Sequence, residues 1–418
     1  MTLHDEMILM GEKAVTASRE LAKCSTKKKN SILEAMADEL IAQKATIQEA
    51  NAKDLAAGKE VGLSTAMLDR LELNDSRIEG MVKGLSDVAA LKDPVGTELS
   101  CWNRPNGLQI KKVRVPIGVI AIIFESRPNV TADAASLCFK TSNAVILRGG
   151  KEAVHSNQAI AKALREGGLK KGMPEDAIQL VQTTDRDAVR ELAQMTGKVD
   201  LIIPRGGDGL IKAVSEMAWV PVIKHYKGVC HTYVDASADI DMALAICENA
   251  KVQRPGVCNA METLLVHKDA ADAFLPKMIA RLKECGVELR GDEAVQKFDS
   301  DVIAATEADW PEEFLDLILA IRVVVGVDAA IEHINTYGSH HSDAIVTTNA
   351  ESEKAFLAQV DSSSVYVNAS TRFTDGAEFG MGAEIGISTD KLHARGPMGL
   401  EELTTYKYVI EGTGQIRP

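Results

Sequence analysis

Cys258 stands in a context that favours nucleophilic chemistry. It lies in the stretch QRPGVCNAMETLLV, just after a Pro-Gly turn and just before a predicted strand, so its thiol is held on a constrained loop. The positive charge of nearby Arg254 would favour the thiolate, which is the reactive form of cysteine. Most free cysteines are inert buried side chains, and on the residues alone this alternative stays open.

The other thiols and the histidines give weaker signals. The chain has seven cysteines, an odd number, and no C-x-x-C pair, which excludes a disulfide framework and the paired spacing of a zinc site. Histidines also lack H-x-x-H or H-E-x-x-H spacing, so we predict no metal site. Four other thiols have the surroundings of inert buried cysteines. Cys138 and Cys247 lie on apolar helix faces, Cys230 lies in an apolar strand, and Cys285 lies at a helix end.

Two glycine-rich turns that carry basic residues end predicted strands. The first turn consists of Arg148, Gly149, Gly150 and Lys151 after NAVIL, and the second of Arg205, Gly206 and Gly207 after VDLIIP. Such a turn before a helix leaves backbone N–H groups free for a phosphate. Neither turn matches G-x-G-x-x-G or the P-loop, so a plain strand-to-helix turn is the alternative. Their occurrence on one predicted sheet favours a nucleotide phosphate site.

A third turn and an acidic pair complete the candidates. ESRPN places Ser126 and Arg127 at the end of the apolar run VIAIIF, and open α/β sheets bind ligands outside such strand ends. Glu312 and Glu313 follow Pro311 in EEFLDLILA. Acidic residues are favoured in the first turn of a helix, so these two glutamates would serve equally well as ordinary helix-start residues.

The elements that must position these residues alternate between strands and helices. Residues 10–90 carry apolar side chains at three- and four-residue steps without proline, which predicts helices. Two β-prone runs around Pro105-Asn106-Gly107 predict a hairpin. From 114 to 235 and from 229 to 368 short β-branched runs alternate with helical stretches. This pattern predicts an α/β fold with two parallel-sheet domains in tandem.

The composition is that of a soluble globular protein of two or three domains. The 418 residues are 45% apolar and 26% charged, which excludes disordered, collagen-like and small disulfide-stapled proteins. A net charge of −13 and 4% aromatic residues argue against nucleic-acid binding. The apolar stretches fall short of the roughly 20 residues of a membrane span, and the amino terminus lacks the features of a secretory signal. We therefore expect a cytoplasmic protein without a membrane or nucleic-acid partner.

Five sequence blocks resemble the gamma-glutamyl phosphate reductase family of the aldehyde dehydrogenase superfamily. The blocks are VPIGVIAIIFESRPNVTADAASLCFKTSNAVILRGGKEA, VDLIIPRGG, GVCHTYVD, CNAMETLLVH and DSSSVYVNASTRFTDGAEFGMGAEIGISTDKLHARGPMGLEELTTYKYV. They extend over essentially the whole chain. The resemblance implies an NADPH-binding domain formed by residues 1–97 and 114–227, and a catalytic domain formed by residues 228–390. It also implies an oligomerisation hairpin and carboxy-terminal strand at 98–113 and 391–418, and hence a homo-oligomer.

The family resemblance implies reduction of L-glutamyl 5-phosphate to L-glutamate 5-semialdehyde with NADPH, the second step of proline synthesis from glutamate. Cys258 falls at the nucleophile position, where its thiolate would attack the acyl carbonyl and form a thioester after phosphate leaves. Glu313 falls at the position of the glutamate that holds the nicotinamide ribose. We expect the N–H of Cys258 and a group near Ser126 to stabilise the oxyanion. Candidates for the phosphate and carboxylate of the substrate are Arg127, Arg254, Asn259 and Arg372, the arginines because their planar forks match both groups.

Two further expectations concern specificity. The stretch VIKHYKGVC corresponds to the place where hydrolytic aldehyde dehydrogenases carry a water-activating glutamate, and it holds no carboxylate, which favours reduction over hydrolysis. His225 in this stretch receives no role. Arg148, Lys151 and Arg205 around the glycine turns predict a preference for the 2′-phosphate of NADPH.

Rival readings are an acylating dehydrogenase that uses coenzyme A, an ordinary aldehyde oxidiser, and a catalytically silent nucleotide-binding or scaffolding protein. The intact Cys258 and both glycine turns argue against the silent protein. A transient contact with the upstream glutamate kinase would shield the labile acyl phosphate, although no motif in the sequence indicates one.

Overall fold

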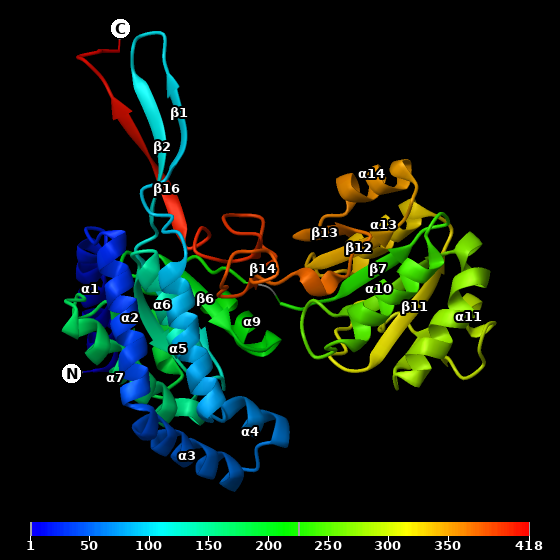
Figure 1. Ribbon diagram of the computed structural model, residues 1–418, viewed down its shortest axis with the longest axis horizontal. Coiled ribbons are helices and arrows are strands. Elements are labelled where there is room, and N and C mark those ends of the chain that lie inside the picture. The colour runs from blue at the N-terminus through cyan, green and yellow to red at the C-terminus, as the bar shows by residue number, and fades with distance from the viewer. Residues whose placement is uncertain (1, 225, 418) are drawn as a thin grey trace. The chain divides into compact units, whose positions relative to one another are not determined.

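The computed structural model describes residues 2–224 and 226–417, which form two compact units (Figure 1). The first unit contains residues 2–224, 380–386 and 398–417, and the second contains residues 226–379 and 387–397. The expected domain boundaries were 227/228 and 390/391. The chain passes from the first unit to the second near 224 and crosses between them again around 379–398. His225 lies outside the described residues.

The first unit is built on a four-stranded parallel sheet in the order β5-β4-β3-β6. Every residue of β3 is buried, because β-branched and aliphatic side chains of this strand face helices on both sides. The strands are β3 (Val119–Phe124), β4 (Ala144–Arg148), β5 (Ile178–Leu180) and β6 (Leu201–Arg205). The helices are α1 (Leu3–Leu21), α2 (Thr26–Ala42), α3 (Lys44–Glu60), α4 (Thr65–Leu71), α5 (Asp75–Ala90), α6 (Val130–Lys140), α7 (Val154–Lys170), α8 (Asp187–Ala193) and α9 (Asp208–Met217), with the 3-10 turn η1 (Lys151–Ala153).

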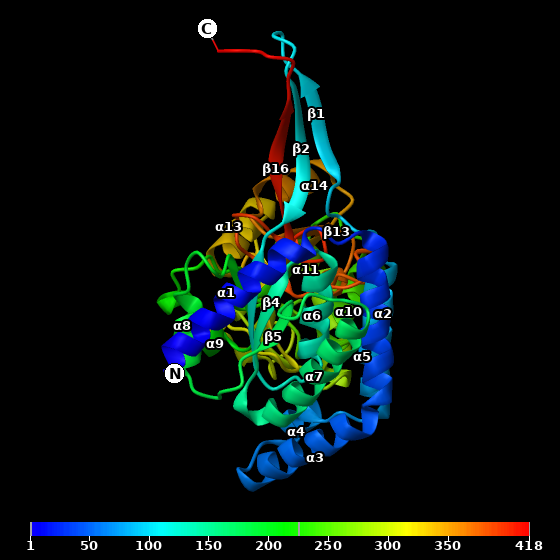
Figure 2. The same cartoon turned by 90° about the vertical axis from the view of Figure 1, so that its left-hand side faces the viewer.

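The amino-terminal helices cover this sheet, as their apolar spacing predicted. Helix α1 packs over β3, β4 and β5, and α2 packs against α5 and α7 (Figure 2). Ser25 and Asn74 begin α2 and α5, and each accepts a hydrogen bond from a backbone N–H of the first helical turn.

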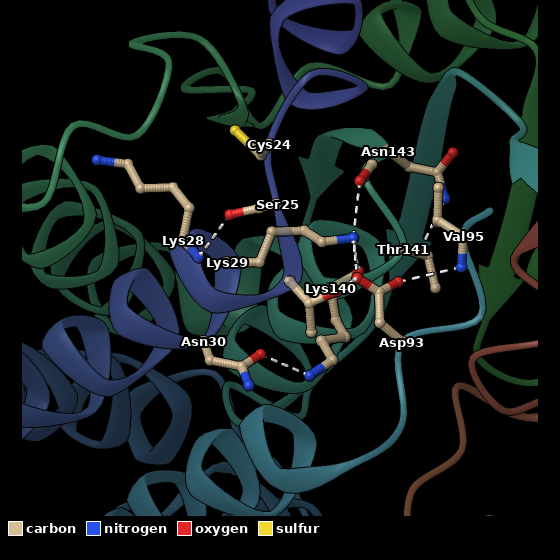
Figure 3. A network of polar contacts seen from close by, with 12 residues as sticks. Cys24, Ser25, Lys28, Lys29, Asn30, Asp93, Val95, Lys140, Thr141 and Asn143 are labelled. Carbon is tan, nitrogen blue, oxygen red and sulfur yellow. Dashed lines mark hydrogen bonds and ion pairs between the residues drawn. The ribbon is translucent and has the colours of Figure 1, made fainter.

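A buried polar cluster fastens these helices to α6 (Figure 3). Lys29 Nζ lies 2.6 Å from Asp93 Oδ2 and donates to Lys140 O at 2.8 Å and to Ser142 Oγ at 2.9 Å. Lys140 Nζ donates to Asn30 Oδ1 and to a backbone carbonyl of α5. Both lysines are fully buried, so this cluster depends on its complete set of acceptors.

A three-stranded antiparallel sheet projects from the first unit (Figures 1 and 2). The predicted hairpin forms β1 (Glu98–Asn103) and β2 (Gln109–Pro116), and β16 (Thr404–Glu411) pairs with the other edge of β2. Its exposed aromatic side chains include Trp102, Tyr406 and Tyr408. The predicted hairpin and carboxy-terminal strand are therefore confirmed as structural elements.

The second unit contains a seven-stranded parallel sheet in the order β10-β9-β11-β8-β7-β12-β13. One apolar core lies between this sheet and α10 and α11, and the other lies between the sheet and α13 and α14. The strands are β7 (Cys230–Val234), β8 (Met261–His267), β9 (Glu288–Gly291), β10 (Ile303–Ala304), β11 (Ile318–Val324), β12 (Ser342–Val346) and β13 (Ser364–Val367), with the short antiparallel pair β14 (Ile387–Ser388) and β15 (Gly396–Pro397). The helices are α10 (Ile240–Val252), α11 (Lys268–Glu284), α12 (Glu293–Gln296), α13 (Val327–Tyr337), α14 (Ala350–Gln359) and the 3-10 turn η2 (Thr371–Phe373).

The predicted α/β class with two parallel sheets is confirmed, with two local differences. Between α11 and β11 the structure adds β9, α12 and β10, whose short lengths left no clear periodicity in the sequence. Glu312 and Glu313 do not begin a helix, because residues 312–315 have no regular structure and Leu315 adopts a left-handed backbone with φ 54°. Across residues 2–224 and 226–417 no helix is both long and apolar enough to cross a membrane.

Candidate active site

The structure brings the three predicted ligand turns to one edge of the first sheet. β4, β3 and β6 are adjacent parallel strands, so their carboxyl ends meet at the same edge. Arg148–Lys151 follows β4, the ESRPN turn follows β3, and Arg205–Gly207 ends β6. Backbone hydrogen bonds connect the last two turns, because Glu125 N–H donates to Arg205 O at 3.2 Å. This edge is where open α/β sheets bind their ligands.

Glu125, which the sequence analysis did not single out, occupies the second glycine turn. Its Oε2 accepts the N–H of Gly207 at 2.9 Å, and a Cβ on Gly206 would lie 2.6 Å from the same carboxylate. Gly207 is also the residue at which α9 begins, without a side-chain cap. The turn therefore holds an anionic oxygen at a helix start, which is the chemistry of a phosphate site. The signal for Glu125 was its place directly after the buried strand β3.

The three predicted cofactor cations differ in their surroundings. Arg148 is buried, and its guanidinium donates to the backbone carbonyls of Gly149 at 3.0 Å, Thr184 and Asp185. Arg205 is half-buried and lies against Gly386, where a Cβ would be 2.4 Å from Arg205 Nη1. Lys151 is exposed at the start of η1. Lys151 is thus the most accessible of these charges.

Gly149 and Gly150 lie close to neighbouring side chains of this turn. A Cβ on Gly149 would lie 2.1 Å from the Asn157 amide nitrogen, and one on Gly150 would lie 2.6 Å from a Glu152 carboxylate oxygen. Ser126 is half-buried and Arg127 is exposed on the neighbouring ESRPN turn. All of these residues belong to the first unit.

Cys258 lies in the second unit, on the loop between α10 and β8. The loop meets the amino end of the adjacent strand β7, where Gly228 lies directly against Cys258. A Cβ on Gly228 would be 2.0 Å from Cys258 O and 2.4 Å from Cys258 Cα. Cys258 itself is half-buried. The candidate nucleophile is therefore held at the amino end of two parallel strands, on a backbone that admits only glycine beside it.

Glu313 lies at the same place. Its Oε1 accepts the N–H of Gly228 at 2.8 Å, so the carboxylate predicted to hold a ribose is linked through Gly228 to Cys258. The neighbouring Glu312 pairs with Lys227 at 3.3 Å. The sequence had no signal for the Glu313–Gly228 contact, because the two residues lie 85 positions apart.

Arg372, one of the predicted substrate arginines, is electrostatically coupled both to Cys258 and to Arg254. Burial and the like charge of Arg254 lower the pKa of the Arg372 guanidinium, and Cys258 acts in the opposite direction. Arg372 Nε donates to Gln253 Oε1 at 2.9 Å, which fixes the guanidinium beside the loop. Arg254 is exposed on the same loop. The structure thus brings Cys258, Arg254 and Arg372 together, while Arg127 belongs to the other unit.

Asn259 is buried and makes its contacts with protein backbone. Its Nδ2 donates to Thr374 O at 2.9 Å and to Arg372 O at 3.4 Å. Thr371 Oγ1 donates to Asn259 O at 2.7 Å. Asn259 therefore joins the Cys258 loop to the segment that carries Arg372.

Behind Cys258 lies a buried hydrogen-bonded chain that the sequence analysis missed. The Cys230 thiol donates to Cys258 O at 3.2 Å and lies 3.7 Å from His341 Nδ1. The chain continues through Ser342 on β12 and Thr374 to Tyr366 on β13. Burial raises the pKa of the Cys230 thiol well above its usual value, so this sulfur stays protonated and donates.

A buried ion pair closes the base of the Cys258 loop. Lys251 Nζ lies 2.5 Å from Glu262 Oε2, and both side chains are completely inaccessible to solvent. Glu262 is the one acidic residue of the apolar strand β8. An acidic side chain in such a strand indicates a buried partner of opposite charge, and this was the sequence signal for the pair.

Comparisons with known proteins agree with this fold and with a cysteine on the loop before a strand. The sequence model described as "Aldehyde dehydrogenase family" matches residues 5–297. The chain belongs to the aldehyde dehydrogenase family. Within it the chain groups with the gamma-glutamyl phosphate reductases, being 60% identical to that of Moorella thermoacetica over 99% of both chains, and 54% identical to that of Halothermothrix orenii over 100% of both.

Solved structures agree with this grouping. The crystal structure of the gamma-glutamyl phosphate reductase from Thermotoga maritima has a TM-score of 0.97 and 47% identity, over 99% of this chain and 100% of that chain. An acetylating aldehyde dehydrogenase from Geobacillus thermoglucosidasius has a TM-score of 0.67 at 17% identity, which indicates the shared fold alone.

Proposed function

We propose that the chain catalyses the reduction of L-glutamyl 5-phosphate to L-glutamate 5-semialdehyde and phosphate, the second step of proline biosynthesis from glutamate. The observation that supports it best is the placement of Cys258 beside Arg254 and Arg372, in a chain that is 60% identical to a gamma-glutamyl phosphate reductase over its full length. A nucleophile next to two cations suits a substrate that carries a phosphate and a carboxylate.

In this proposal the Cys258 thiolate attacks the acyl carbonyl, the C–O bond to phosphate breaks, and phosphate leaves with the bonding electron pair. The product of this step is a thioester on Cys258. Arg372 and Arg254 bind the anionic groups and favour the thiolate. The carbonyl of Cys258 is held by the Cys230 thiol, which keeps the loop in one orientation for both tetrahedral intermediates. Ser126, which belongs to the first unit, is proposed to help stabilise the oxyanion.

NADPH is the proposed cofactor, and it supplies the hydride that reduces the thioester. The glycine turn at Gly206 and Gly207 is proposed to bind its phosphates through the N–H of Gly207, which binds an anionic oxygen of Glu125 in this structure and which Glu125 would release to the phosphate. Lys151 is the favoured partner for the 2′-phosphate, since Arg148 is engaged by backbone carbonyls. Glu313 is proposed to hold the nicotinamide ribose.

The reverse reaction tests this function. L-glutamate 5-semialdehyde, phosphate and NADP⁺ are supplied, and NADPH formation is followed by absorbance. We expect phosphate-dependent formation that is lost in Cys258→Ala and retained in Cys24→Ala, whose thiol lies just after α1 and outside every proposed site. Oxidation that proceeds equally without phosphate would indicate an ordinary aldehyde dehydrogenase, and a requirement for coenzyme A would indicate an acylating one.

A homo-oligomer that uses the sheet β1-β2-β16 is also proposed. The sheet exposes Trp102, Tyr406 and Tyr408, and aromatic side chains are enriched at interfaces. Light scattering of the wild type and of Tyr406→Lys/Tyr408→Lys should give a smaller assembly for the variant. A cytoplasmic location and a transient contact with glutamate kinase belong to the same proposal, and co-sedimentation with the kinase tests the contact.

A further inference from the structure

We propose that Glu262 is a positioning residue for Cys258: it closes the base of the nucleophile loop and also holds the segment that carries Glu313. The inference rests on the proposed function, in which Cys258 is the nucleophile. It assigns a task to a buried acid that contacts neither substrate nor cofactor in that proposal.

The Lys251–Glu262 ion pair spans the two ends of the loop that carries Cys258. Lys251 is in the last turn of α10 and Glu262 is the second residue of β8, so they flank the loop 253–260. Their 2.5 Å contact, at zero exposure of both side chains, fixes the distance between the two ends of this loop. Cys258 can therefore shift only if the loop deforms or the ion pair breaks.

The other oxygen of the Glu262 carboxylate binds the backbone near Glu313. Glu262 Oε1 accepts the N–H of Leu315 at 3.1 Å. Leu315 has a left-handed backbone with φ 54°, a conformation that a leucine keeps only where its surroundings enforce it. The Glu262 contact supplies part of that enforcement.

Glu313 connects the Leu315 segment to the Cys258 backbone. Glu313 lies two residues before Leu315, and its carboxylate accepts the N–H of Gly228, which is packed against the Cys258 backbone. Glu262 thus reaches Cys258 by two routes. One runs through Lys251 and the loop, and the other runs through Leu315, Glu313 and Gly228.

Burying the Lys251–Glu262 pair costs desolvation free energy, and apolar side chains could fill the same space without that cost. Burial raises the pKa of Glu262 to about 7, against the opposing effects of Lys251 and the Leu315 N–H, while Glu313 adds to the rise. Burial also lowers the pKa of Lys251, with Glu262, Asp316 and Cys230 acting in the opposite direction. Apolar residues of similar volume often stabilise a protein as well as such a pair does. A requirement for fixed geometry near Cys258 gives the pair a reason to exist.

The test compares Glu262→Leu and Glu262→Gln with Asp93→Asn in the full-length protein. Asp93→Asn breaks a second buried Lys–carboxylate pair, Lys29–Asp93 in the first unit, and serves as the control for destabilisation. Three quantities are measured for each variant. They are the thermal midpoint, kcat and KM in the phosphate-dependent reverse reaction, and the iodoacetamide alkylation rate of Cys258 in the free protein, resolved by mass spectrometry of its peptide.

We expect Glu262→Leu to lower kcat by about 10- to 100-fold, because small displacements of a reacting group have effects of this size. The same displacement should slow alkylation of Cys258 by about tenfold, because the thiol moves away from the Arg372 charge that favours its thiolate. Glu262→Gln should lose less, since its amide oxygen still accepts the Leu315 N–H. Asp93→Asn should lower the thermal midpoint and leave Cys258 alkylation within about twofold of the wild type.

Glu262 variants that lower the thermal midpoint but leave alkylation and kcat within about twofold, as in the control, would overturn the inference. If Glu262→Leu does not fold, the same criterion applies to Glu262→Gln. Alkylation needs no substrate, so its result is separate from the proposed function. That function fails instead if Cys258→Ala retains turnover, or if NADPH forms without phosphate.

Discussion

Gly228 lies so close to Cys258 that a single methyl group on Gly228 would come within 2.0 Å of the Cys258 carbonyl oxygen and 2.4 Å of its Cα. Both atoms belong to backbone, so no side-chain rotation relieves the overlap. The same glycine donates its N–H to Glu313. One residue without a side chain thus fixes the distance between the candidate nucleophile and a carboxylate of the cofactor proposal.

Gly228→Ala should therefore lower kcat by about 100-fold or more, because the Cys258 loop must move to admit the methyl group. The control is Gly80→Ala in helix α5, where nothing lies within 4 Å of an added Cβ. The control should be more stable by about 0.5–1 kcal/mol and fully active. Steady-state kinetics and thermal unfolding of both variants check this, and a Gly228→Ala enzyme with wild-type kcat would contradict the close approach.

Arg372→Met should slow alkylation of Cys258 at pH 7 by about tenfold and raise KM for phosphate in the reverse reaction. Both effects follow from removal of a cation that is coupled to Cys258. Arg281→Met removes an arginine from helix α11, where it pairs with Glu248, and should change neither quantity. Equal alkylation rates in the two variants would show that Arg372 does not act on the thiol.

Asp133→Asn should change how stability depends on pH. Burial raises the pKa of Asp133 from 3.8 to about 6, although Asn129 and Arg205 oppose the rise. The folded state therefore binds this proton more tightly than the unfolded state. The stabilising contribution is complete below pH 4 and is lost as the pH rises through 6.

The variant should accordingly gain about 3 kcal/mol relative to the wild type between pH 3 and pH 7, since burial raises the pKa of Asp133 by about two units. Urea unfolding of both proteins at a series of pH values measures this difference. A difference that stays constant from pH 4 to pH 7 would show that Asp133 is ionised in the folded protein across that range.

Asp93→Asn should lower the unfolding free energy by about 3–5 kcal/mol, because it leaves the Lys29 charge buried without its carboxylate partner. Thr26→Val is the matched variant, since it removes only the hydroxyl that donates to Asp93 and should cost about 1 kcal/mol. Both losses are measured by urea unfolding. A loss below 1 kcal/mol for Asp93→Asn would mean that water reaches Lys29 in the folded state.

The sequence patterns predicted the architecture well because hydrophobic periodicity is a local signal. The runs VIAIIF and NAVILR became β3 and β4, and the Pro105-Asn106-Gly107 turn joined β1 to β2. For the site, local context singled out Cys258 and its neighbour Arg254, and the family resemblance added Arg372. The structure brings these three residues together.

What the sequence did not predict depends on contacts between distant positions. Glu313 meets Gly228 from 85 residues away, and Asn259 meets Thr374 from 115 residues away. The amide nitrogen of Asn259, a residue predicted to bind substrate, donates to backbone carbonyls. No local pattern carries such information, because the contacts arise only when parallel strands align their ends.

The placement of Cys258 at the amino end of its strands has an electrostatic consequence. In a parallel α/β unit this edge faces the carboxyl ends of the helices, and the Cys258 loop begins where α10 ends, at Val252. The carboxyl end of a helix carries a partial negative charge, which opposes a thiolate. Arg254 and Arg372 offset this charge: each carries a full positive charge against about half a negative charge at the helix end, so either one alone keeps this edge attractive to an anion, and loss of both would leave it repulsive.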